Sequence, residues 1–356
     1  MTMPRPSFVT SSGPSPVRGF IAAIAHLFPR REAPVGPHGH LTRASGCPDH
    51  AWTTIIPHGD GDREHRGPAT CGRLPPMTSH TTGHTTGQTT GDLTSGPVLL
   101  DVSDGVATIT LNRPEAMNSL DITTKEILVE VVRQVSEDPA VRCVVLTGTG
   151  RAFCTGQDLK EHINLLETGG SDQLFTTVEK HYNPIVSAIM SMDKPVIAAV
   201  NGVAAGAGAS LAMACDLRVV ADTAGFNLAF AGVALSCDTG ASISLPLLVG
   251  RAKAIELLYF PRTVPATEAL ELGLATRVVS PDDLPGEVAS LAARLAAGPT
   301  RAYGAMRRSV TYAAGHDTDE ALDFERQMMN STGATEDHRA AVAAFVAKEK
   351  PVFTGR

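Results

Sequence analysis

The stretch over residues 201–216, Asn-Gly-Val-Ala-Ala-Gly-Ala-Gly-Ala-Ser-Leu-Ala-Met-Ala-Cys-Asp, constrains the fold of this chain more than any other part. It follows an apolar run at 195–200 that predicts a buried strand, and it ends at 211–214 in what reads as the first turns of a helix. Residues without large side chains let a ligand approach the backbone, and the N-terminus of a helix favours a negatively charged oxygen. Close packing of a helix on a sheet requires the same small residues. This stretch alone does not distinguish the two interpretations.

Strands and helices alternate on both sides of this stretch. Two short β-rich runs flank a Ser-Asp-Gly turn and predict a hairpin, and apolar residues at helical spacing predict a helix over 121–136. The predicted strands are 98–102, 106–111, 143–147, 196–200 and 217–221, and a further helix is expected around 174–192. This order predicts an α/β fold with parallel strands and right-handed crossovers. Residues 223–242 show no clear period.

The last hundred residues are predominantly helical. Leu, Ala, Val and Met recur there at three- and four-residue spacing. The predicted helices are 252–258, 266–272, 284–297, 300–313, 317–329 and 336–347, with one short strand at 275–279. Helices that follow an α/β core often cover a site or build an oligomer interface.

The N-terminal residues 1–97 differ in kind from the rest. They hold eight of the 12 His and 13 of the 24 Pro, and they include a Thr-Thr-Gly repeat at 81–91. Such a composition cannot bury enough apolar surface to offset the entropy of ordering, so a disordered low-complexity extension is expected. Met77 stands just before the repeat. We hypothesise that Met77 is the true start of the protein.

Composition excludes several classes of protein. The formal charge of −7 and the absence of Lys/Arg runs argue against a nucleic-acid partner. The six Cys have no paired spacing, which favours free thiols in a reducing compartment and hence a cytoplasmic location. No apolar run approaches the ~20 residues of a membrane span, so no membrane partner is expected.

Two small-residue loops, 152–159 and 204–211, each stand between a strand and a helix. Together with Leu-Asn-Arg-Pro-Glu-Ala-Met-Asn at 111–118, they resemble the crotonase (enoyl-CoA hydratase/isomerase) superfamily. The resemblance runs from about residue 98 to Arg356. It implies a spiral core of ββα turns over 98–285 and a helical trimerisation region over 286–356. It also implies a homotrimer or a dimer of trimers, with an acyl-CoA substrate and no cofactor beyond the coenzyme A that the substrate carries.

The resemblance assigns roles to residues of both loops. It implies that the backbone N–H groups of Gln157 and Ala207 hold the thioester oxygen of the acyl-CoA. It implies substrate contacts for Arg113, Ala152, Cys154, Gly156, Asp158, Leu159, Lys160, Gly206, Gly208, Ser210 and Phe230. Among these, Lys160 and Arg113 are expected to meet the phosphates of coenzyme A.

The type of reaction depends on the acidic residues. Hydratases of the family carry two Glu at positions that here hold Ser210 and Phe230, neither of which is a carboxylate base. Asp238 stands where isomerase members carry their acid, and the surrounding motifs resemble the branch of 1,2-epoxyphenylacetyl-CoA isomerases. This predicts a double-bond or ring isomerase in which Asp238 shuttles a proton. Its apolar neighbourhood favours a raised pKa.

The sequence also allows a different role for Asp238, a different reaction and a non-catalytic protein. Asp238 could instead cap a helix that begins near Thr239, because Asp is a preferred N-cap. The reaction could be another of the family's, such as hydration, thioester hydrolysis or decarboxylation, and the chain could be a non-catalytic oligomeric homologue. Cys154 and Cys237 lie in the motifs without a neighbouring His, which favours small pocket-lining thiols over nucleophiles.

Overall fold

The computed structural model describes residues 93–168 and 174–356. The predicted N-terminal extension and its Met77 start therefore lie almost entirely outside the described residues. Within residues 93–97, the carbonyl of Leu93 accepts the N–H of Leu100 at 3.0 Å, and the Leu93 side chain packs on the core.

The larger of two sheets has six strands in the order β1-β2-β3-β5-β7-β10. Its strands are β1 (Val98–Ser103), β2 (Val106–Leu111), β3 (Cys143–Gly148), β5 (Val196–Val200), β7 (Leu217–Ala221) and β10 (Arg277–Val279). The first two form the predicted hairpin, whose turn residues Asp104 and Gly105 both have positive φ (51° and 77°). All other neighbours in this sheet are parallel. The predicted parallel α/β arrangement is confirmed.

The second sheet consists of short strands in the order β4-β6-β8-β9. They are β4 (Ala152–Cys154), β6 (Val203–Ala205), β8 (Gly225–Asn227) and β9 (Thr263–Pro265). The sequence interpretation was wrong to treat the first two wholly as turns, because three residues are too few to reveal a two-residue period. Each long strand from β3 to β7 is followed by a short one and then by helical residues. This is the expected spiral of ββα turns.

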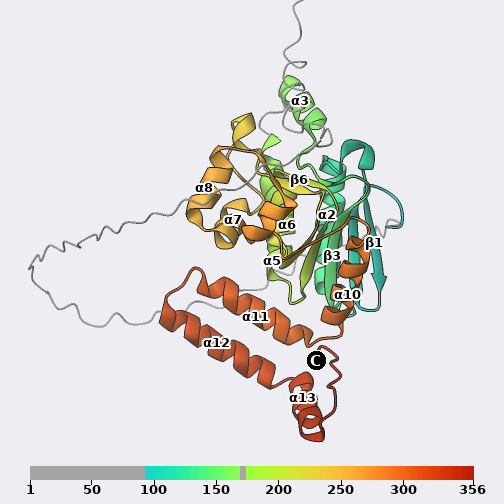
Figure 1. The fold of residues 1–356 in the computed structure, drawn as a ribbon, viewed down its shortest axis with the longest axis vertical. Coiled ribbons are helices and arrows are strands. Elements are labelled where there is room, and N and C mark those ends of the chain that lie inside the picture. Colours follow the sequence, from blue (N-terminus) through green and yellow to red (C-terminus); the bar gives the residue numbers. More distant parts are fainter. Residues whose placement is uncertain (1–92, 169–173) are drawn as a thin grey trace, which may run out of the picture. The chain divides into compact units, whose positions relative to one another are not determined.

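Most helices between and around the sheets follow the predicted periodicity. The helices in these positions are α2 (Ile122–Glu137), α3 (Leu159–Glu167), α5 (Asn183–Ser191), α6 (Ala207–Ala214), α7 (Ala241–Val249), α8 (Arg251–Tyr259), α9 (Ala266–Glu271) and α10 (Leu284–Ala296). The ranges of α3 and α7 were not predicted. Helix α2 begins at the cap Asp121, whose Oδ1 accepts the Thr124 N–H at 2.8 Å. Helix α10 packs against β2, β3, β5 and β7 of the larger sheet (Figure 1).

Two helices depart from the prediction. The helix expected over 174–192 contains a wide turn, η2 (Val178–Tyr182), in which the Asn183 N–H donates to the carbonyl of Val178. Pro184, which has no N–H, follows this turn directly. Helix α6 begins at Ala207 rather than near Leu211, and every residue of it is buried. Its Gly and Ala residues carry a weak helical pattern but fit between packed layers.

The C-terminal helices are α11 (Thr300–Ala313), α12 (Thr318–Gly333) and α13 (Glu336–Ala347). Helices α11 and α12 lie side by side in Figure 1. Arg142 ties this region to the core, because its guanidinium donates to Thr300 Oγ1 at 3.0 Å and to the carbonyls of Phe353 and Gly298 at 2.8 and 2.5 Å. Large apolar side chains such as Phe345 stay exposed on these helices. None of the helices in residues 93–168 and 174–356 is long and apolar enough to cross a membrane.

Candidate active site

The two small-residue loops lie against one another. Strand β4 pairs in parallel with β6, so the residues that follow the two strands become neighbours. A Cβ on Gly156 would lie 2.9 Å from the carbonyl oxygen of Ala205 and 3.1 Å from the backbone nitrogen of Ala207. A Cβ on Gly208 would lie 2.1 Å from the carbonyl oxygen of Cys154. Glycine at both positions is therefore what allows the loops to meet.

Gly206 shapes the passage between β6 and α6. Its backbone, with φ 50° and ψ −124°, adopts a conformation that only glycine takes readily. A Cβ there would meet no described atom within 4 Å, so this face of the loop is open. Gly206 therefore places no side chain over the start of α6.

The backbone N–H groups of Gln157 and Ala207 have no acceptor in the part of the chain that the structure describes, and neither do those of Gly208 and Ala209 in the first turn of α6. Leu120 donates to the carbonyl of Gly156 at 2.8 Å and accepts from the Asp158 N–H at 3.1 Å. In such a parallel bridge the N–H of Gln157, between them, points away from Leu120. Ala207 is the first residue of α6, and first-turn N–H groups have no partner within their helix. Two such donors can bind an anionic oxygen.

Asp238 lies between the short helix η3 (Ala231–Val233) and α7. The alternative that its side chain caps a helix is wrong: the N-cap of α7 is Gly240, and α7 has no side-chain cap. Thr239 and Gly240 both have positive φ (53° and 75°), which separates the Asp238 carboxylate from the helix N-terminus. Its Oδ1 accepts a hydrogen bond from Thr239 Oγ1 at 2.8 Å.

The electrostatic environment of Asp238 suits a base. Burial raises the pKa of its carboxyl, while the hydrogen bond from Thr239 and the charge of Lys125 act in the opposite direction. The segment also packs on α5, since a Cβ on Gly240 would lie 2.9 Å from Val186 Cγ1. Tyr182, at the end of η2, is buried, and its pKa is raised by burial and further by the charge of Asp238. A carboxylate whose pKa is raised holds and releases a proton more readily near neutral pH.

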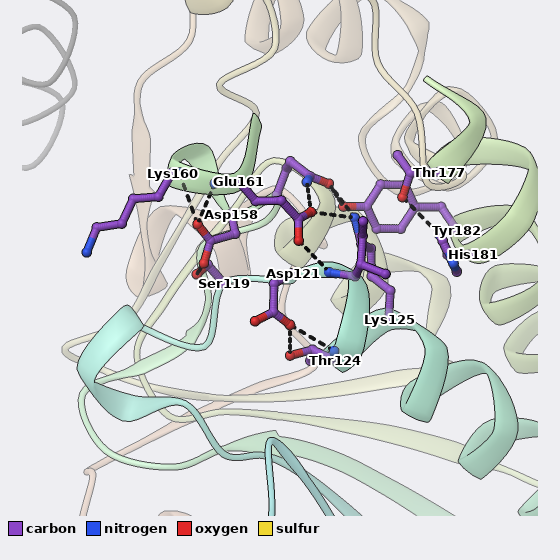
Figure 2. Close-up of polar contacts among 12 residues, drawn as sticks. Ser119, Asp121, Thr124, Lys125, Asp158, Lys160, Glu161, Thr177, His181 and Tyr182 are labelled. Carbon is purple, nitrogen blue, oxygen red and sulfur yellow. Dashed lines mark hydrogen bonds and ion pairs between the residues drawn. The ribbon is translucent and has the colours of Figure 1, made fainter. Parts of the chain in front are cut away.

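Asp158 and Arg113 stabilise the end of the 152–159 loop through hydrogen bonds and ion pairs. Asp158 Oδ1 caps α3 by accepting the N–H groups of Lys160 and Glu161 at 3.0 and 3.4 Å. Its Oδ2 lies 3.0 Å from Arg113 NH2, and the same NH2 lies 3.1 Å from Asp121 Oδ2. The Lys160 side chain points away from this cluster in Figure 2. A phosphate contact remains a prediction for both cations, and the Arg113 guanidinium already has two carboxylate partners.

The other predicted site residues lie near the junction in different ways. Ser210 is fully buried, and its Oγ donates to the carbonyl of Gly206 at 3.0 Å. Phe230 is partly buried and packs on the core. Ala152 and Cys154 are buried within β4, and Leu159 is the first residue of α3. No carboxylate stands at either hydratase position.

The sequence did not predict a buried lysine, Lys125, that contacts Gln157. Lys125 of α2 has only 1% of its surface exposed, and it contacts Gln157 and Glu161 (Figure 2). The signal was present in the helical pattern, because position 125 shares the buried face of α2 with Leu128, Val132 and Val135. A lysine on the apolar face of a helix indicates a specific buried partner.

The described cysteines differ in burial. Burial raises the pKa of the Cys143, Cys154 and Cys215 thiols to about 12, whereas Cys237 is partly exposed. Since the thiolate is the reactive form, iodoacetamide at neutral pH should modify Cys237 and spare the other three in the native protein. Peptide mass mapping checks this, with denatured protein and Cys237→Ser as controls. Native labelling of Cys154 as fast as that of Cys237 would contradict it.

Comparison with known proteins identifies the family of this chain. A family model described as enoyl-CoA hydratase/isomerase matches residues 101–356. The chain is 41% identical over 259 residues to 1,2-epoxyphenylacetyl-CoA isomerase from Escherichia coli, covering 73% of this chain and 98% of that protein. It is 34% identical over 260 residues to (E)-benzylidenesuccinyl-CoA hydratase from Thauera aromatica, covering 73% and 99%. The crystal structure of enoyl-CoA hydratase from Bacillus anthracis superposes with a TM-score of 0.69 at 31% identity, covering 73% and 100%. Since the match spans most of the chain and nearly all of each relative, the protein belongs to the enoyl-CoA hydratase/isomerase family.

Proposed function

We propose that this enzyme is an acyl-CoA isomerase that moves a double bond, or rearranges a ring, through a thioester enolate. The observation that carries the proposal is the placement of one carboxylate. Asp238 is partly buried with a raised pKa, while the two hydratase positions hold Ser210 and Phe230. The E. coli relative, which is named as an isomerase, supports the same reading.

The proposed reaction is a proton shuttle. The Asp238 carboxylate removes a proton from a carbon activated by the thioester, and the electron pair of the broken C–H bond moves into the thioester carbonyl. The N–H groups of Gln157 and Ala207 donate to the resulting enolate oxygen. Asp238 then returns the proton to a different carbon, and the electron pair leaves the oxygen to form the new C–H bond. One carboxylate suffices because it ends the cycle as it began.

Hydration requires different acid/base groups from isomerisation. A hydratase must both deprotonate a water molecule and protonate a carbon of the substrate. The Ser210 hydroxyl already donates to the carbonyl of Gly206, and Phe230 has no ionisable group. The hydratase name of the T. aromatica relative keeps hydration as the competing reaction to measure.

We further propose that the protein assembles as a homotrimer or a dimer of trimers through its C-terminal helices. Apolar side chains on α11, α12 and α13 are exposed in the single chain, among them Val310, Met329, Phe345 and Val346. Assembly would remove this surface from water.

A substrate panel tests the isomerase proposal. The full chain is assayed with 3-enoyl-CoA, 2-enoyl-CoA and 1,2-epoxyphenylacetyl-CoA, and the products are separated by chromatography. We expect isomerisation of 3-enoyl-CoA or of the epoxide to exceed hydration of 2-enoyl-CoA by about 10²-fold or more, the rate that a missing acid/base group costs. Hydration as fast as isomerisation would contradict the proposal.

A further inference from the structure

The ammonium of Lys125 is buried in the first turn of α2, where a charge is stable only with well-placed partners. Its Nζ donates to Gln157 Oε1 at 3.1 Å and lies 3.5 Å from Glu161 Oε1. It also stands over the ring of Tyr182, 5.6 Å from the ring centre. Burial lowers the pKa of Lys125, and the neighbouring Glu161 acts against this effect.

Lys125, Glu161 and Tyr182, which are labelled in Figure 2, all contact the side-chain amide of Gln157. Gln157 Oε1 accepts from Lys125 Nζ and, at 2.6 Å, from the Tyr182 hydroxyl. Gln157 Nε2 donates to Glu161 Oε1 at 3.2 Å. Three elements, α2, α3 and η2, therefore hold both ends of the Gln157 amide. A half-buried polar residue with no specific task does not need three such partners.

The backbone of the same residue explains the need for this restraint. The peptide that carries the Gln157 N–H follows Gly156, whose missing Cβ lets the backbone of Ala205 and Ala207 approach closely. On the opposite side, the Leu120 N–H holds the Gly156 carbonyl of the same peptide. The Gln157 side chain adds a further restraint at the Cα to which this peptide is joined. Glu161 strengthens it, because its second carboxylate oxygen accepts the Ile122 N–H at 2.8 Å and so ties α3 to the start of α2.

We propose that Lys125, Glu161 and Tyr182 form a clamp on the Gln157 side chain that aims the Gln157 N–H at the substrate oxygen. The inference rests on the proposed function, since it assigns the clamp to enolate stabilisation. Lys125, Glu161 and Tyr182 act as positioning residues, because they reach the reacting oxygen only through Gln157.

Tyr182→Phe and Lys125→Met test the clamp. Tyr182→Phe keeps the ring and removes a single hydrogen bond, and Lys125→Met keeps the length of the side chain while removing the charge. We expect kcat for the preferred substrate to fall about 3- to 10-fold in the first and about 10- to 100-fold in the second, the sizes of a neutral and a charged hydrogen bond. KM should change less than about twofold, because the lost interaction is made mainly to the enolate-like transition state. Lys253→Met, which removes an exposed ion pair to Glu256, is the matched control and should leave kcat unchanged.

A double-mutant cycle distinguishes positioning from a general structural effect. In a Gln157→Met background, Lys125→Met should have almost no further effect on kcat, because both changes break the same clamp. A merely structural loss would instead add to the effect of Gln157→Met. Where Lys125→Met does not fold, Tyr182→Phe in the same background carries the test.

An equilibrium readout separates this inference from the proposed function. Bound acetoacetyl-CoA can ionise to an enolate, whose near-ultraviolet absorbance reports stabilisation of the oxyanion without turnover. We expect the enolate fraction to fall in Tyr182→Phe and in Lys125→Met. Unchanged kcat and unchanged enolate absorbance in both variants, with an active parent, would overturn the clamp and leave the isomerase intact. A parent that neither isomerises any substrate of the panel nor ionises acetoacetyl-CoA would overturn both.

Discussion

Replacing Asp238 with Asn should lower kcat for the proposed isomerisation by about 10²- to 10⁴-fold, the usual contribution of a positioned acid/base group. The amide keeps the shape of the carboxyl but cannot take up a proton, so KM should change little. Steady-state kinetics on the substrate that the full chain prefers measures both constants. Asp222→Asn, which changes an exposed aspartate just after β7, is the matched control and should retain full activity.

The pH dependence of the parent enzyme follows from the same group. Because burial raises the pKa of Asp238 above its ordinary value of 3.8, kcat should fall as the pH decreases through that raised pKa. The carboxylate that serves as the base is progressively protonated there. The residual activity of Asp238→Asn should lack this acidic limb. If kcat of Asp238→Asn also fell at low pH with the same midpoint, the titrating group would be a residue other than Asp238.

Stability gives an independent check on the same variant. A raised pKa means that the folded state binds this proton more tightly than the unfolded chain does. The free energy of unfolding therefore falls as the pH rises from the unfolded-state pKa through the folded-state pKa of Asp238. Above both values the whole of this destabilisation is present. Asp238→Asn removes this destabilisation, so at neutral pH its Tm should equal or exceed that of the parent. A Tm lower by more than about 5 °C would mean that the carboxylate supports the fold, and the activity loss would then have a structural cause.

Gly156→Ala should lower kcat by about 10²- to 10³-fold, the cost of losing one oxyanion-hole donor. The new Cβ would lie 3.1 Å from the Ala207 nitrogen and 2.9 Å from the Ala205 carbonyl oxygen, so the two loops must separate. Separation misaligns the N–H groups of Gln157 and Ala207 together. Kinetics and the enolate absorbance of bound acetoacetyl-CoA should both report the loss.

Gly105→Ala isolates the effect of backbone strain from that of the site. Gly105 has a φ of 77°, close to the 85° of Gly156, but its Cβ would meet nothing nearer than 3.6 Å, and it stands in the β1–β2 turn. Both variants should lose stability through the positive φ, by about 1 kcal/mol. Only Gly156→Ala should also lose activity. Equal losses of activity in the two variants would remove Gly156 from the proposed oxyanion site.

Several structural features of this enzyme can be predicted from the sequence because residues close together in the chain determine them. The buried runs at β3 and β5 and the apolar faces of α2 and α10 are set by side chains within one element. The tight approach of the two loops is encoded in Gly156 and Gly208, where any side chain would strike a backbone carbonyl oxygen. The absence of carboxylates at Ser210 and Phe230 needs no structure at all.

Other features depend on residues that are far apart in the chain. The three-residue strands β4 and β6 carry too little pattern to be recognised, and each exists because a neighbouring strand accepts its hydrogen bonds. Whether Asp238 caps a helix depended on two left-handed residues after it, which propensity does not reveal. The ion pairs of the Arg113 guanidinium with Asp121 and Asp158 likewise join residues that are separated in the chain.

The clamp on Gln157 is the clearest case of this kind. Lys125 and Tyr182 stand 32 and 25 residues from Gln157 in the chain, and the sequence predicted no contact of either with Gln157. The free N–H of Ala207 follows from a local helix start, whereas that of Gln157 depends on the bridge to Leu120. In the proposed clamp, side chains from three elements position the Gln157 N–H. Their meeting is a consequence of packing, since a buried ammonium is stable only where the folded chain brings its partners to it.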